Sequence, residues 1–175
     1  TSGCSSVASN ATSVTVNPTP STPTISTGGA TTLCTGGSVT LTSSSATGNQ
    51  WYVGGVLIGG ATSQNYSATA TGNYTVIVTA GSCSSVASNA TSVTVNPIPA
   101  TPTISTITPT TFCTGGSVTL SSSSATGNQW YVGGVLIGGA TSQNYSATAT
   151  GNYTVVVTTS GCSSVASNAT SVTVN

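Results

Sequence analysis

Apolar and polar residues alternate along short stretches that recur through the chain. In Ser38–Ser43, Val39 and Leu41 alternate with serine and threonine, and Tyr74–Val78 follows the same rule. Alternation with a period of two is typical of a strand that buries one face. No stretch has a helical period of useful length. The pattern therefore predicts an all-β chain.

Glycine and proline mark where these strands turn or end. Gln50–Val53 and Val56–Ile58 flank a Gly-Gly pair, which two-residue hairpins favour because both turn positions need positive φ. Ser92–Asn96 alternates again and stops at a proline, so we predict a last strand there. Prolines leading into Thr24–Ser26 and Thr103–Ser105 predict stiff linkers before a first strand.

The chain repeats itself after 79 residues. This shift superposes three pairs of landmarks: Cys34 on Cys113, Trp51 on Trp130, and Cys83 on Cys162. Residues 18–96 and 97–175 then differ at 11 positions, and residues 1–17 match residues 159–175 without a change. We predict two complete repeats, 18–96 and 97–175. Residues 1–17 would be the last strand of a preceding repeat, or a donor strand for a neighbouring unit.

Each repeat carries the landmarks of an immunoglobulin-like β-sandwich. A tryptophan lies on the third predicted strand, and a Gly-Asn-Tyr sequence precedes the sixth, where a tyrosine corner is expected. We predict tandem immunoglobulin-like sandwiches arranged head to tail. The predicted core residues are Val39, Leu41, Trp51 and Tyr74 in the first repeat, and Val118, Leu120, Trp130 and Tyr153 in the second.

A family resemblance follows from these motifs together. They are Cys-Thr-Gly-Gly-Ser-Val-Thr-Leu at 34–41, Trp51, Gly-Asn-Tyr at 72–74, Gly-Ser-Cys at 81–83 and Ser-Val-Thr-Val-Asn at 92–96. The set resembles the tandem Ig-like repeats of giant surface proteins in Bacteroidetes-type bacteria. The resemblance implies a secreted, non-catalytic protein with a role in adhesion or in a surface coat.

Composition removes whole classes of function. The chain has no Asp, Glu, Lys, Arg or His, whereas ordinary domains are about a quarter charged. Nothing can neutralise phosphates, so we expect no nucleic acid partner. No apolar run reaches the roughly 18 residues of a membrane span, so we expect no membrane insertion. Without general acids, bases or carboxylate ligands, we predict no enzyme, no cofactor and no metal site.

The five cysteines predict disulfides and hence an extracellular protein. They are Cys4, Cys34, Cys83, Cys113 and Cys162. One pairing lies within each repeat, Cys34–Cys83 and Cys113–Cys162. The other joins repeats through Cys34–Cys162, because the ends of the strands concerned lie far apart in one sandwich. The sequence leaves both pairings open.

Asparagine sequons and tyrosines are candidates for sugar chemistry. Seven asparagines precede x-Ser/Thr and are glycosylation candidates: Asn10, Asn65, Asn73, Asn89, Asn144, Asn152 and Asn168. Tyr52, Tyr66, Tyr131 and Tyr145 would stack on sugars if exposed, and are ordinary strand tyrosines otherwise.

Two functions fit the sequence. The first is a structural repeat of an extracellular fibre or adhesin stalk on the cell surface, partnered by copies of itself in a head-to-tail filament. The second is a carbohydrate-binding or adhesive module, with surface carbohydrate or covalent glycans as partners. Loops that are the same in both repeats favour the first.

Overall fold

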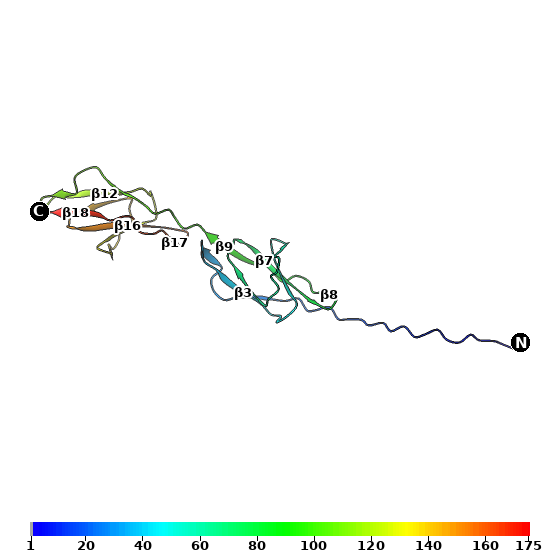
Figure 1. Ribbon diagram of the computed structural model, residues 1–175. Coiled ribbons are helices and arrows are strands. Elements are labelled where there is room, and N and C mark those ends of the chain that lie inside the picture. The colour runs from blue at the N-terminus through cyan, green and yellow to red at the C-terminus, as the bar shows by residue number, and fades with distance from the viewer. Residues whose placement is uncertain (1) are drawn as a thin grey trace. The chain divides into compact units, whose positions relative to one another are not determined.

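The computed structural model describes residues 2–175, and this part of the chain contains strands and no helix (Figure 1). None of the described residues therefore forms a helix long and apolar enough to cross a membrane. Each repeat builds one three-stranded sheet and one six-stranded sheet. The fold is a pair of tandem immunoglobulin-like domains that follow one another along the chain.

The strands of the first repeat divide between its two sheets in a fixed order. The smaller sheet has the order β1 (Ile25–Thr27), β3 (Val39–Ser43) and β6 (Asn65–Ala68). The larger has the order β2 (Thr32–Cys34), β9 (Thr91–Asn96), β7 (Gly72–Ala80), β4 (Asn49–Val53) and β5 (Val56–Leu57), with β8 (Cys83–Ser84) paired to β7. Figure 1 shows β7 beside β9.

The second repeat has the same order. Its smaller sheet contains β10 (Ile104–Thr106), β12 (Val118–Ser122) and β15 (Asn144–Ala147). Its larger sheet contains β11 (Thr111–Phe112), β18 (Thr170–Val174), β16 (Gly151–Thr159), β13 (Asn128–Val132) and β14 (Val135–Leu136), with β17 (Cys162–Ser163) paired to β16.

The first predicted strand is divided between the two sheets. β1 pairs antiparallel with β3 in the small sheet, and β2 then pairs parallel with β9 in the large one. The sequence pattern predicts β1, one residue out of place, and misses β2 because Thr32–Cys34 is too short to alternate visibly. β6 and β8 are missed for the same reason.

The predicted hairpin is confirmed. Tyr52 pairs with Leu57 and Val53 with Val56, so the connection is two glycines. Gly54 and Gly55 have φ of 56° and 80°, a left-handed conformation that only glycine adopts without a steric cost.

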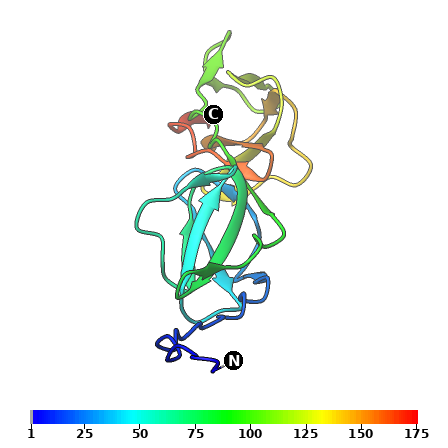
Figure 2. The same ribbon diagram turned by 90° about the vertical axis from the view of Figure 1, so that its right-hand side faces the viewer.

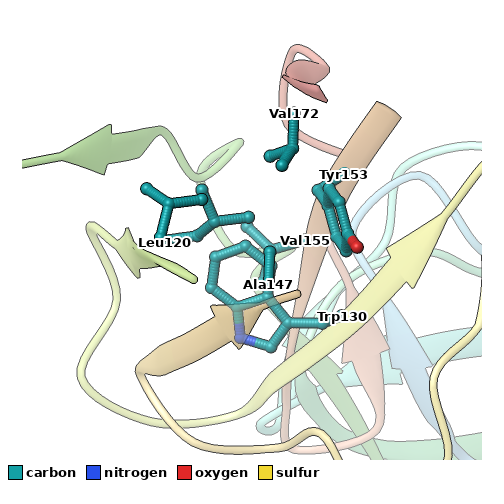
Figure 3. Close-up of a cluster of buried hydrophobic side chains, with 7 residues drawn as sticks. Leu120, Trp130, Ala147, Tyr153, Val155 and Val172 are labelled. Carbon is teal, nitrogen blue, oxygen red and sulfur yellow. The ribbon is translucent and has the colours of Figure 1, made fainter. Parts of the chain in front are cut away.

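The core of each sandwich is a tryptophan surrounded by aliphatic side chains from both sheets. In the second repeat Trp130 is fully buried, with Tyr153 and Val155 from β16 beside it (Figure 3). Val118, Leu120, Ala147 and Val172 complete this cluster. The corresponding buried residues of the first repeat are Val39, Leu41, Trp51, Ala68, Tyr74, Val76 and Val93. Each indole remains satisfied because its Nε1–H donates to a backbone carbonyl, that of Ser63 or Ser142, at 2.9 Å.

Serine side chains complete the large sheet where β9 does not reach. The backbone N–H groups of Val76 and Val78 donate to Ser88 Oγ and Ser85 Oγ at 3.1 and 3.0 Å. Each serine returns its own N–H to the carbonyl of the same valine. Both serines are buried, so this segment imitates a strand and leaves no buried backbone group of these valines unpaired.

A tyrosine corner closes the second sandwich. Tyr153 is buried, and its hydroxyl donates to the Ala149 carbonyl at 2.9 Å, four residues upstream. This bond is the one expected from the Gly-Asn-Tyr sequence before the strand. It fixes the loop that enters β16.

Residues 2–17 form no strand and are exposed (Figure 2). Backbone contacts divide the chain into two compact units. One contains the described residues up to Gly28 together with 40–66 and 72–92, and the other contains 29–39, 67–71 and 93–175. The repeat boundary after Asn96 stays a prediction from the sequence.

We expect Trp51→Ala to destabilise the first repeat by about 3–5 kcal/mol, because the truncation leaves a cavity at the centre of a close-packed core. Val56→Ala is the matched control, since Val56 is 68% exposed on the hairpin and its loss should change stability by less than about 0.5 kcal/mol. Equal midpoints of thermal unfolding for the two variants would show that Trp51 is not the centre of the core.

Candidate functional site: a disulfide and three free thiols

The parallel pair β2–β9 places the end of one strand beside the end of the other. Cys34 is opposite Asn96 in the register. The Asn96 carbonyl accepts from Thr35 N–H at 2.9 Å and from Thr35 Oγ1 at 3.2 Å. Two donor groups of Thr35, just after the end of β2, therefore meet the backbone oxygen at the end of β9.

A tight turn brings the second cysteine to the same oxygen. Ser160 and Gly161 have φ of 50° and 80°, and the chain then enters β17 at Cys162. The Asn96 side-chain Nδ2 donates to the Ser160 carbonyl at 3.0 Å, which holds the turn in place. Cys162 is 1% exposed, and its Sγ lies 3.9 Å from the Asn96 carbonyl oxygen.

Cys34 and Cys162 form a disulfide. Their Cα atoms are 5.6 Å apart, and the bond joins positions separated by 128 residues. Cys34 Sγ also lies 3.8 Å from the Gly161 carbonyl oxygen. All of these residues belong to the compact unit that contains 29–39 and 93–175. The bond thus connects a strand end of the first sequence repeat to a turn of the second.

The within-repeat pairs left open by the sequence, Cys34–Cys83 and Cys113–Cys162, are not formed. In the second repeat Phe112 pairs with Val174, and Val172 pairs with Gly151 at the start of β16. Cys162 follows the other end of that nine-residue strand. At about 3.3 Å per residue this separation far exceeds the Cα limit of about 7 Å for a disulfide.

Three cysteines remain as free thiols. Cys4 and Cys113 are exposed, and Cys83 is half-buried. Cys83 Sγ donates to the Asn17 carbonyl at 3.7 Å, which is the relation that Cys162 has to Asn96 one repeat later. Of the two pairings that the sequence leaves open, the structure forms the one that joins the repeats, Cys34–Cys162.

The sequon asparagines are all exposed and reachable by a modifying enzyme: Asn10, Asn65, Asn73, Asn89, Asn144, Asn152 and Asn168. Asn49 and Asn128, which are outside sequons, are buried. Glycosylation stays a prediction.

The tyrosines do not form a platform for sugars. Tyr66 lies between Trp51 and Tyr74, with ring centroids 5.8 and 5.7 Å away. Tyr145 repeats this arrangement with Trp130 and Tyr153. Tyr52 and Tyr131 are half-buried on their strands. Tyr66 and Tyr145 therefore extend the core and do not offer a free face for stacking.

The surface hollows of the described residues are small and lined by groups that do not titrate near neutral pH. A hollow of about 320 Å³ lies between Pro23–Ile25 and Asn89–Thr91, and one of about 290 Å³ lies beside Pro20 and Val78. Proline, serine, threonine, valine, alanine and asparagine can bind through shape and hydrogen bonds. They cannot transfer protons at pH 7.

Comparisons with known proteins agree with the fold. Residues 20–97 match the family model described as "Ig-like domain CHU_C associated", which confirms the resemblance to Ig-like repeats of the Bacteroidetes type. No curated protein matches the chain. A chain from the crystal structure of a mouse coronavirus receptor-binding domain complexed with its murine receptor matches with a TM-score of 0.53 and 15% identity, covering 87% of this chain and 100% of that one. At that identity the likeness shows the fold alone.

We expect Cys34→Ser to lower the midpoint of thermal unfolding, whereas Cys113→Ser should leave it unchanged. The two cysteines occupy the same position in consecutive repeats, but only Cys34 is bonded. Opening a loop of this size adds entropy to the unfolded chain worth on the order of 4–5 kcal/mol. Calorimetry of both variants without reductant would contradict the assignment if their midpoints fell equally.

We also expect the stability of the fold to be independent of pH between about pH 4 and 7, because no side chain titrates there. Burial raises the pKa of Tyr153, and a charge on Tyr145 adds to the effect. A raised folded-state pKa means that the unfolded chain loses this proton first. Stability should therefore fall as pH rises above about 10. Circular dichroism monitors both expectations, and unfolding at pH 4 would contradict the expected independence of pH between about pH 4 and 7.

Proposed function

We propose that this chain, which carries an Ig-like domain of the CHU_C-associated type over residues 20–97, is a structural repeat of an extracellular fibre or adhesin stalk. The Ig-like all-β fold is typical of non-catalytic modules, and a disulfide is typical of extracellular proteins. Location on a cell-surface appendage and the absence of enzymatic activity are parts of the same proposal.

The Cys34–Cys162 disulfide is the observation that carries the proposal. It bonds a strand end of one repeat to a turn of the next, so tension applied along the chain passes through a covalent link. Residues between the two cysteines are protected from extension while the bond is intact.

The distribution of differences between the repeats supports a structural role over a binding role. A binding module needs distinctive loops, yet Ser44–Gln50 and Gly59–Gln64 are repeated without change in the second repeat. Differences gather instead at 28–30 and 80–82, and at the equivalent positions of the second repeat, outside those two loop sequences. Near-identical units side by side are what an array with one mechanical job requires.

The missing charges shape both solubility and chemistry. A net charge of zero removes the electrostatic repulsion that normally keeps proteins apart. Glycans on the exposed sequon asparagines would keep such a surface hydrated, and copies of the chain are the partners we propose. Because the chain has no carboxylate or imidazole, we assign the cysteines a role in covalent linkage and the sequon asparagines a role in carrying glycans, and we assign neither group a role in catalysis.

Electron microscopy of unfixed native material tests the proposal. We expect continuous filaments with an axial repeat of one or two domains, each on the order of 35–45 Å from the length of its strands. Sugar density would be seen at the sequon asparagines. Separate short rods that bind immobilised polysaccharide would contradict the proposal and favour the carbohydrate-binding alternative.

A further inference from the structure

Residues 2–17 have the same sequence as the segment that contains the last strand of the second sandwich. The sequence of residues 1–17 is identical to that of 159–175, in which Thr170–Val174 forms β18. The equivalent residues 12–16 form no strand (Figure 2). One sequence is therefore present once as a buried strand and once as an exposed segment.

Burial distinguishes the two copies sharply. Val172 is 0% exposed in the core of the second sandwich, whereas its equivalent Val14 is 82% exposed. β18 lies between β11 and β16, to which it is hydrogen-bonded on both sides. Thr12–Val16 carries the same residues in the same order. It would make the same backbone bonds and bury the same valine in that place.

The disulfide site indicates what would happen at the end of an exchanged strand. In the complete site the Asn96 carbonyl accepts from Thr35 N–H and lies 3.9 Å from Cys162 Sγ, so one oxygen brings both cysteines together. Two other places in the structure each hold half of this arrangement. The Asn175 carbonyl accepts from Thr114 N–H at 2.9 Å, beside free Cys113.

The other half is at Asn17. Its carbonyl accepts from free Cys83 at 3.7 Å, in the relation of Asn96 to Cys162. If Asn17 of one copy occupied the place of Asn175 in another, the two half-sites would combine. Thr114 and Cys83 would then meet at one carbonyl oxygen, with Cys113 beside Cys83.

We propose that a second copy of this chain docks by strand exchange: Thr12–Asn17 of one copy replaces Thr170–Asn175 of the next, and Cys83 of the first then bonds to Cys113 of the second. The inference rests on the structural role proposed above and names its partner and its covalent link. Each copy has both a donor segment and an acceptor sheet, so the contact is head-to-tail and open-ended.

The exchange is close to neutral in contacts, because the leaving and entering strands have the same sequence. Domain swapping of this kind is a low-cost route to association. Protein concentration and the new covalent bond then decide the equilibrium. The existing Cys34–Cys162 bond stays intact, because only the residues after Ala169 leave.

Bond formation requires an oxidant, which we name as a small disulfide such as oxidised glutathione. The thiols of Cys83 and Cys113 together lose two protons and two electrons and form one S–S bond. The small disulfide accepts the electrons and protons and becomes two thiols. The reaction proceeds through a mixed disulfide on one of the two cysteines.

The experiment uses the whole 175-residue chain, reduced, refolded at high concentration and then oxidised with a glutathione buffer. On a non-reducing gel we expect a ladder of covalent oligomers. Val14→Asp should abolish the ladder, because the exchanged strand would bury an unpaired carboxylate at the position of Val172. Val14 is exposed in the monomer, so the thermal unfolding of this variant should match that of the parent chain.

Val7→Asp is the matched control. It places the same charge in the same segment, but outside the exchanged residues, and the equivalent Val165 is 72% exposed. This variant should keep the ladder. Cys113→Ser should lose it, and Cys4→Ser should keep it.

Peptide mapping identifies the new bond. The chain offers no trypsin site, but chymotrypsin cuts after Leu33, Leu41, Tyr74, Phe112, Leu120 and Tyr153 and separates all five cysteines. We expect peptide 75–112 joined to 113–120. Residues 34–41 have the same sequence as 113–120, so loss of this product in Cys113→Ser decides between them. In a mixture of ¹⁴N and ¹⁵N chains, part of this product should join a peptide of one isotope to a peptide of the other, because chains pair at random.

Three results would overturn the exchange: a wild-type chain that stays monomeric after oxidation, a ladder that survives Val14→Asp, or a 75–112 product with no mixed isotopes. The proposed structural role is tested separately, by the bond between Cys34 and Cys162 in peptides 34–41 and 154–175. If that bond persists while the ladder is absent, strand exchange fails and the structural role does not.

Discussion

The parallel pairing of β2 with β9 is the constraint on which the rest of the molecule depends. It places Cys34 opposite the last residue of the sandwich, at the point where the chain leaves for the next repeat. A single antiparallel first strand, confined to the small sheet, would leave Cys34 without this position. Because the first strand is divided, the end of β2, the carbonyl of Asn96 and the turn before β17 meet in one place. The disulfide follows from that meeting.

A fold without charges must be held by packing and by neutral hydrogen bonds. Each sandwich has one tryptophan at its centre, one tyrosine stacked against it, and valines from both sheets around it. Serine side chains replace part of a neighbouring strand, since Ser88 Oγ and Ser85 Oγ accept hydrogen bonds from backbone N–H groups of β7. We therefore expect the stability of each domain to depend little on salt, because the chain has no charged side chain to screen.

The sequence predicts the long strands and the hairpin well, because Val39–Ser43 alternates clearly and Gly54-Gly55 permits one kind of turn. It predicts the sandwich through its tryptophan and its Gly-Asn-Tyr motif. It cannot predict β2 or β8, since strands of two or three residues carry no period. The disulfide pairing stays open for the same reason. Choosing Cys34–Cys162 requires knowing that β2 pairs with β9, and no local pattern encodes that contact.

The extension of a single oxidised chain, pulled by its two ends with an atomic force microscope, tests the central claim most directly. With Cys34–Cys162 intact, tension passes through residues 1–34 and 162–175 alone, so the chain should reach only about 170 Å at full extension. After reduction the full 175 residues should extend to roughly 600 Å. Full extension of the oxidised chain would mean that no covalent link joins the repeats, and would contradict the account.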